Sequence, residues 1–154
     1  NTLLNLSRNI FFYKKINLLD NFETRIYLMF IHFSIMMIVF KKKGKKFDQR
    51  SYDLFFHNIE NNLRESGLGD VSVNKKMKEF NKILYDILLK IEKNKNDNSS
   101  FDINKDLVIK YFSKLKDPKN TNYEEFRTYF LNFFYFCFEV PIDNMLREAI
   151  NFKL

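Results

Sequence analysis

Apolar residues recur at steps of three and four along most of the chain, which is the spacing of one face of an α-helix. Residues that end or bend helices are rare, since the 154 residues include only three glycines and two prolines. No stretch makes a convincing strand, and the length suits one compact domain, residues 1–154. The pattern therefore predicts an all-α fold of about six helices and a last amphipathic piece, at about 2–15, 22–41, 48–66, 72–93, 103–116, 122–139 and 142–152.

Two of these helices have a clear apolar face that we expect to lie in the core. On the third helix this face consists of Tyr52, Phe55, Phe56, Ile59 and Leu63. On the fourth helix it consists of Val73, Met77, Phe80, Leu84, Ile87 and Ile91. The first two turns of the fourth helix also carry four lysines, where cations oppose the helix dipole, so helix stability does not explain them.

The most apolar stretch covers residues 26–40 and is followed by a run of lysines. It is shorter than the ~20 residues that cross a bilayer, and His32 and Ser34 interrupt it. We interpret it as a buried core helix in which His32 is a core histidine rather than a metal ligand. The alternative is a helix lying in the membrane interface. The run that follows offers five lysines for contact with an anionic membrane or RNA: Lys41, Lys42, Lys43, Lys45 and Lys46.

Charge is distributed unevenly along the chain. The polar residues 93–100 predict a flexible loop, and the chain after it holds as many acidic as basic side chains. The net charge of +7 therefore belongs to the first two thirds. A basic surface there favours anionic lipid, RNA or an acidic partner, and it equally fits an ordinary solvated face. No nucleic-acid-binding module accompanies the lysines, and we expect no contact with DNA.

Side chains for catalysis or metal binding are scarce. The only cysteine, Cys137, is expected to be a buried, unpaired thiol, and with two histidines it cannot build a usual zinc site. One face of the third helix carries Asp53, His57, Glu60 and Arg64. A di-iron bundle needs a second copy of such a motif, so we interpret this face as exposed and salt-bridged. The sequence thus predicts neither a cofactor nor an enzyme.

Two of the three glycines lie in the segment NNLRESGLGDVSVNKKM, residues 61–77. They do not form a nucleotide-binding loop, which would follow a strand and need further glycines or a Lys-Ser/Thr pair. The segment resembles the signature of the ubiquinol–cytochrome c chaperone family, a Leu-Arg-Glu-Met-Gly-Val-Gly-Asp run followed by Val and Met-Lys. The matching residues here are Leu63-Arg64-Glu65-Ser66-Gly67-Leu68-Gly69-Asp70, Val73 and Met77-Lys78.

A second block of residues supports the resemblance. It consists of Tyr13, Asp20, Arg25 and Ile31-His32, at spacings similar to those of the family. The resemblance covers about residues 8–92. Ser66 and Leu68 depart from the family signature, in which Met and Val are usual.

The resemblance implies an all-helical assembly chaperone of respiratory complex III. Its members bind newly made cytochrome b together with a second assembly factor, near the inner membrane and the ribosome exit. We therefore expect a soluble or peripheral protein on the matrix side of the inner membrane, or on the cytoplasmic side if the source is bacterial. The alternative is an accessory protein of a mitochondrial ribosome that binds rRNA through its basic first two thirds.

The glycine-rich segment also has a structural interpretation as a helix–helix corner. Gly67 suits the left-handed residue that ends a helix, and Gly69 would let the chain turn before Asp70 or Ser72 caps the next one. Arg64 is placed to pair with Asp70 across the turn. The same corner is the predicted partner-binding site, formed by Leu63, Arg64, Glu65, Gly67, Gly69, Asp70, Val73, Lys75, Lys76, Met77 and Lys78.

Overall fold

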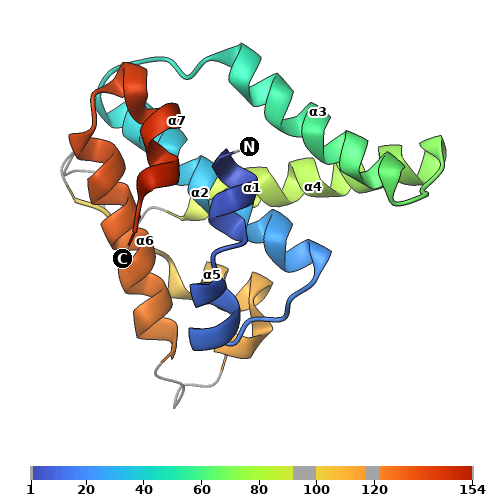
Figure 1. Cartoon of the computed structure of the whole chain (residues 1–154), viewed down its shortest axis with the longest axis horizontal. Coiled ribbons are helices and arrows are strands. Elements are labelled where there is room, and N and C mark those ends of the chain that lie inside the picture. Colours follow the sequence, from blue (N-terminus) through green and yellow to red (C-terminus); the bar gives the residue numbers. More distant parts are fainter. Residues whose placement is uncertain (1, 92–99, 117–121, 154) are drawn as a thin grey trace.

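A computed structural model describes residues 2–91, 100–116 and 122–153. Within these ranges the fold consists of seven α-helices with no strand, as the sequence predicts (Figure 1). The helices are α1 Thr2–Ser7, α2 Phe22–Lys42, α3 Gln49–Glu65, α4 Asp70–Lys90, α5 Lys105–Tyr111, α6 Asn122–Glu139 and α7 Met145–Glu148. Short helical turns cover Phe11–Lys15, Ser113–Leu115, Ile142–Asn144 and Ala149–Asn151.

Helix α2 is the centre of the fold and contacts α1, α4 and α6. In the part of the chain that the structure describes, it is the one helix long and apolar enough to cross a membrane. However, 72% of its most apolar window is buried inside the protein. Its phenylalanines pack on α3, with the Phe33 and Phe55 rings stacked 4.6 Å apart. The prediction of a core helix over residues 26–40 is therefore confirmed, against a helix lying in the membrane interface.

The apolar faces predicted for α3 and α4 are also confirmed. Phe55, Phe56, Ile59 and Leu63 are buried on α3, and Val73, Phe80, Leu84 and Ile87 are buried on α4. Ile91 follows α4 and is fully buried, while Tyr52 and Met77 are partly buried against the same core. The two helices run back across α2 as a hairpin whose corner projects from the rest of the molecule (Figure 1).

Three predicted helices are shorter or more broken than their apolar spacing suggests. The first ends at Ser7, because the Asn9 side chain accepts the Phe11 backbone N–H at 3.1 Å and so favours a turn over a continuous helix. The fifth ends at Tyr111, since the backbone of Phe112 is no longer helical. The piece at 142–152 consists of three short turns. The predicted loop at 93–100 lies, apart from Ser100, outside the described residues.

His32 lies at the centre of the core and joins α2 to α6. Its Nδ1–H donates to the Leu28 carbonyl at 2.7 Å, so Nε2 accepts from the Tyr129 hydroxyl at 2.9 Å. The rings of Phe130 and Phe133 pack edge-on against the imidazole. With both nitrogens bonded inside the protein, the interpretation of His32 as a core histidine is confirmed. Cys137 is likewise a free, buried thiol.

We predict that His32 makes stability depend on pH. Burial lowers the pKa of His32 from 6.5 to about 4. Between these values the unfolded imidazole takes up a proton that the folded one does not, so the free energy of unfolding falls as the pH falls. The loss should be about 3 kcal/mol between pH 7 and pH 4, measured by urea unfolding. His32→Gln should remove this contribution, whereas the exposed control His57→Gln should keep it. Equal pH profiles for both variants would contradict the prediction.

Candidate functional site

The signature segment forms the corner between α3 and α4. Helix α3 ends at Glu65, and Gly67 has φ +95°, the left-handed conformation predicted for it. Its backbone N–H bonds the Arg64 carbonyl at 3.0 Å. The prediction that Asp70 or Ser72 caps α4 is wrong. Gly69 occupies the N-cap position in an extended conformation, and Asp70 is the first helical residue.

The Asp70 carboxylate pairs with Arg64 instead of capping the helix. Arg64 spans the corner, because one nitrogen of its guanidinium bonds Asp70 and another bonds Glu60 at 2.8 Å. On the same face of α3, Gln49 donates to Asp53 at 2.8 Å. The predicted Arg64–Asp70 pair and the ion pairing of the Glu60 face are therefore confirmed. Both pairs lie at the surface, so their role is to orient the corner rather than to supply much stability.

The residues of the predicted partner-binding corner divide into two groups. Leu63 and Val73 are buried, and Met77 is half-buried against the core. Lys76 lies along α4, with its ammonium 3.6 Å from Glu79 and over the ring of Phe80. The remaining members are exposed, namely Arg64, Glu65, Gly67, Gly69, Asp70, Lys75 and Lys78. The buried members hold the two helices together, and the exposed members are available to a partner.

Two exposed apolar residues at the corner were not among the predicted site residues. Val71 is 85% exposed and Leu68 is 39% exposed. Neither belongs to the apolar stripe of its neighbouring helix, which is the signal in the sequence that could have identified them. Together with Lys75 and Lys78 they give the corner an apolar tip beside a basic helix start. Such a surface can hold an apolar segment by burial and orient it by charge.

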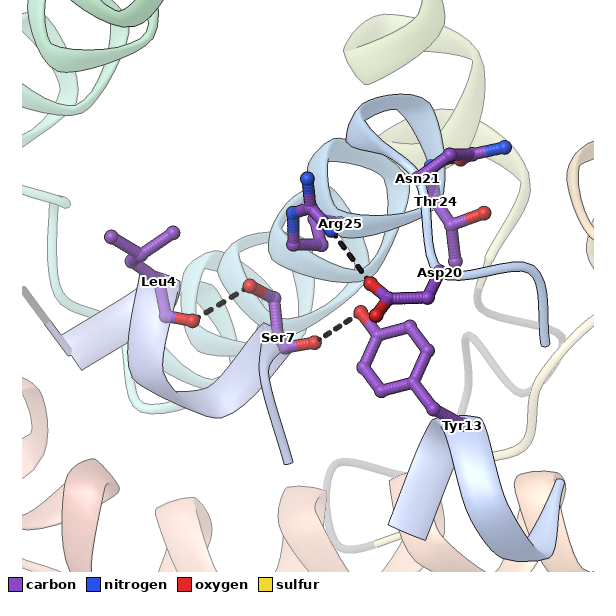
Figure 2. Close-up of polar contacts among 7 residues, drawn as sticks. All are labelled: Leu4, Ser7, Tyr13, Asp20, Asn21, Thr24 and Arg25. Carbon is purple, nitrogen blue, oxygen red and sulfur yellow. Dashed lines mark hydrogen bonds and ion pairs between the residues drawn. The ribbon is translucent and has the colours of Figure 1, made fainter. Parts of the chain in front are cut away.

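The second family block makes local hydrogen bonds within the N-terminal segment and within the start of α2 (Figure 2). The Tyr13 hydroxyl donates to the Ser7 carbonyl at 2.7 Å, and Arg25 pairs with Asp20 at 2.7 Å. Asn21 caps α2 by accepting the Thr24 backbone N–H at 2.9 Å. Burial raises the pKa of Tyr13 to about 12, so its hydroxyl stays a donor at physiological pH.

The start of α2 packs against the middle of α4. The ring centres of Phe22, the first residue of α2, and Phe80 lie 6.3 Å apart. An open hollow of about 610 Å³ lies beside the second block, lined by Arg8, Ile10, Tyr13, Lys14, Asp20 and Arg25. Ile31 and His32, the last members of the block, are buried in α2. The block thus has a packing side and a side accessible to solvent.

The lysine run begins in the last turn of α2 and continues beyond it, and only some of its side chains are available to bind a ligand. The Lys43 ammonium donates to the Val140 carbonyl at 2.9 Å and lies 5.4 Å from the Phe138 ring centre. Lys42 lies 6.0 Å from the Phe134 ring centre. Both therefore help to hold the C-terminal end of α6 against α2. Lys41, Lys45 and Lys46 are exposed, and contact of this run with membrane or RNA stays a prediction.

The described residues offer no evident metal centre. Across 2–91, 100–116 and 122–153, no three His, Cys, Asp or Glu side chains come together as a metal would need. The Asp86 carboxylate has a structural role. It bonds Lys90, Lys110 and Tyr111 and so ties α4 to α5. These bonds hold the pKa of the Asp86 carboxyl well below its usual range.

A comparison with models of known protein families shows which family this chain belongs to. The family model described as "Ubiquinol-cytochrome C chaperone" matches residues 14–130. The chain belongs to this family. The match includes the signature segment and the second block from Asp20 onward, with Tyr13 one residue before its start, and it extends through α5 into α6, beyond the end of the resemblance over 8–92. No match was found among curated proteins or solved structures. Membership implies a role as an assembly chaperone of complex III, in a family that is generally not enzymatic.

We predict that Gly67→Ala lowers the free energy of unfolding by about 1 kcal/mol. An added Cβ would meet nothing within 4 Å, so the cost comes only from the left-handed backbone. The matched control is Gly69→Ala, where φ is −74° and the space is equally open, and a smaller change is expected there. Thermal or urea unfolding measures both. Unchanged stability of Gly67→Ala together with lost binding to cytochrome b would assign this glycine to partner contact instead.

We also predict different roles for two neighbouring lysines. Lys43→Met removes the bond to Val140 but keeps the aliphatic contact, and should lower the free energy of unfolding by about 1 kcal/mol. Lys45→Met, at an exposed position, should change it by less than about 0.5 kcal/mol. Urea unfolding of both variants at one pH measures the difference. Equal effects would mean that the Lys43 bond contributes nothing to the fold.

Proposed function

We propose that this protein holds newly made cytochrome b during assembly of complex III, and that the α3–α4 corner contacts it. Family membership supports the assembly role. The observation that supports the contact is the exposure of Leu68 and Val71 on a projecting corner. A newly made membrane subunit presents apolar segments before insertion, and these need an apolar surface to cover them.

The charge of the first two thirds supports a place of work beside an anionic surface. Lys41 at the end of α2 and Lys45 and Lys46 just after it are exposed. Such lysines favour the headgroups of the inner membrane or the RNA around a ribosome exit. We propose peripheral attachment on the matrix side, or on the cytoplasmic side in a bacterium. Because the contact is electrostatic, a high-salt wash should weaken it.

The rival function is that of an accessory protein of a mitochondrial ribosome. It would use the same lysines on rRNA and would not need an apolar corner. The chaperone explains both the exposed apolar residues and the family match, whereas the rival explains only the charge. The two therefore predict different contacts for position 68.

A photo-crosslinking residue at Leu68 tests the proposal in organelles or cells that are translating with labelled amino acids. We expect labelled cytochrome b in the adducts. Leu68→Ser/Val71→Ser, combined with a crosslinker at Gly69, should lower the yield about tenfold, because the apolar contact is lost. The matched control Leu54→Ser/Ile150→Ser, at two other exposed apolar positions, should leave it unchanged. Adducts with rRNA alone, on ribosomes that make no cytochrome b, would support the rival instead.

A further inference from the structure

Helix α4 has a second stripe, opposite the one in the core. It consists of Lys75, Lys78, Lys82, Tyr85 and Leu89, spaced three, four, three and four residues apart. All five are exposed. At 3.6 residues per turn they fall within about 80° of the helix circumference and extend over about 21 Å. This set, called the α4 lysine stripe, is the centre of the solvent-facing side of α4.

The lysines of the stripe have no acidic partner among the residues that the structure describes. The nearest acidic residues on α4 are engaged elsewhere, Glu79 with Lys76 and Asp86 with α5. Lys75, Lys78 and Lys82 lie within about two helical turns of one another. Because their ammonium groups are not paired with carboxylates of the described residues, they repel one another. Lys75 lies in the second turn of α4, Lys78 in the third and Lys82 just past the middle, and like charges three or four residues apart destabilise a helix. Folding does not explain this arrangement, whereas a bound anionic partner does.

The C-terminal end of the stripe is apolar. Leu89 is 72% exposed and Tyr85 is 55% exposed. Tyr85 lies close to Tyr52 of α3, and after burial it is the next cause of the raised pKa of the Tyr52 hydroxyl. The surface thus changes from three cations to two large apolar groups within one straight helix face. Both parts are presented on a helix whose opposite face is locked into the core.

We propose that the α4 lysine stripe docks an acidic amphipathic helix of a second protein. The complementary helix carries carboxylates at three positions spaced three or four residues apart, and apolar residues one or two turns beyond them. Its carboxylates pair with Lys75, Lys78 and Lys82, and its apolar end covers Tyr85 and Leu89. This partner differs from the apolar cytochrome b segment at the corner, so the inference goes beyond the proposed function.

A bilayer or an RNA strand fits the same surface less well. A helix lying in a membrane needs its apolar residues along the centre of the buried face, and here lysines occupy that centre. RNA would use the lysines but would leave Leu89 without a contact. An acidic helix satisfies both parts of the stripe at the helical spacing that the stripe itself has.

The test uses the full-length protein with a photo-crosslinking residue at Lys82, in the organelle or cell where it works. Adducts are digested and the crosslinked segment is sequenced by mass spectrometry. We expect a protein segment with at least three Asp or Glu within two or three helical turns. The variant Lys75→Glu/Lys78→Glu should lower the yield at least tenfold. The control Lys116→Glu/Lys153→Glu makes the same change of net charge at exposed positions outside α4 that have no proposed binding role, and it should leave the yield unchanged.

Three crosslinking results would overturn the proposal, in addition to the result for the charge variants given next: adducts with lipid or RNA, adducts with a protein segment that lacks such an acidic cluster, or no adduct at all. Equal loss in the two charge variants would also overturn it, because the effect would then be one of net charge. Changing the carboxylates of the identified segment to lysine should restore binding to the Lys75→Glu/Lys78→Glu variant. Cytochrome b crosslinking at position 68 provides a separate measurement. Its absence with the acidic adduct retained would reject the proposed function and leave the stripe intact.

Discussion

The burial of α2 is the constraint on which the rest of the structure depends. A helix of this apolarity must be covered on almost every side, and the other elements are arranged to do so. The one polar ring in its middle, His32, is accommodated because Leu28 and Tyr129 satisfy both nitrogens. That network also fixes α6 against α2, since one bond joins residues far apart in the chain. The surface features of the hairpin are thus built on a core that cannot shift freely.

The family signature contains both residues that pack in the core and residues that are exposed at the corner. Leu63 and Val73 hold the ends of α3 and α4 in the core, so the turn between them has little freedom. Gly67 supplies the left-handed residue that reverses the chain, and Arg64 links both sides of the turn. Leu68 and Val71 are then displayed in a fixed geometry. A rigid apolar tip loses less conformational entropy on binding than a mobile loop would.

The sequence predicts the long helices well and the short elements poorly, for a physical reason. Helices α2, α3, α4 and α6 follow from apolar periodicity because each buries one continuous face. The break after Ser7 depends on one side-chain hydrogen bond, and the start of α4 at Asp70 depends on the extended backbone of Gly69; apolar periodicity records neither. The structural role of Lys43 could not be predicted from the sequence for a similar reason. Its hydrogen-bond partner is the carbonyl of Val140, far along the chain. A run of lysines in the sequence does not indicate which of them bonds a distant carbonyl and which is exposed.

The corner and the α4 lysine stripe share one helix, and this has a mechanical consequence. Val71 lies one turn before Lys75, so whatever docks on the stripe is held at a fixed distance from whatever contacts the corner. An apolar substrate on Leu68 and Val71 and an acidic partner on the stripe would therefore contact different apolar side chains, with Lys75 and Lys78 between them. Charge gives the partner fast and selective association, while burial at the corner favours any sufficiently apolar segment. If both proposals hold, the apolar corner alone would discriminate little among apolar segments, and the partner selected by the charged stripe would add the specificity.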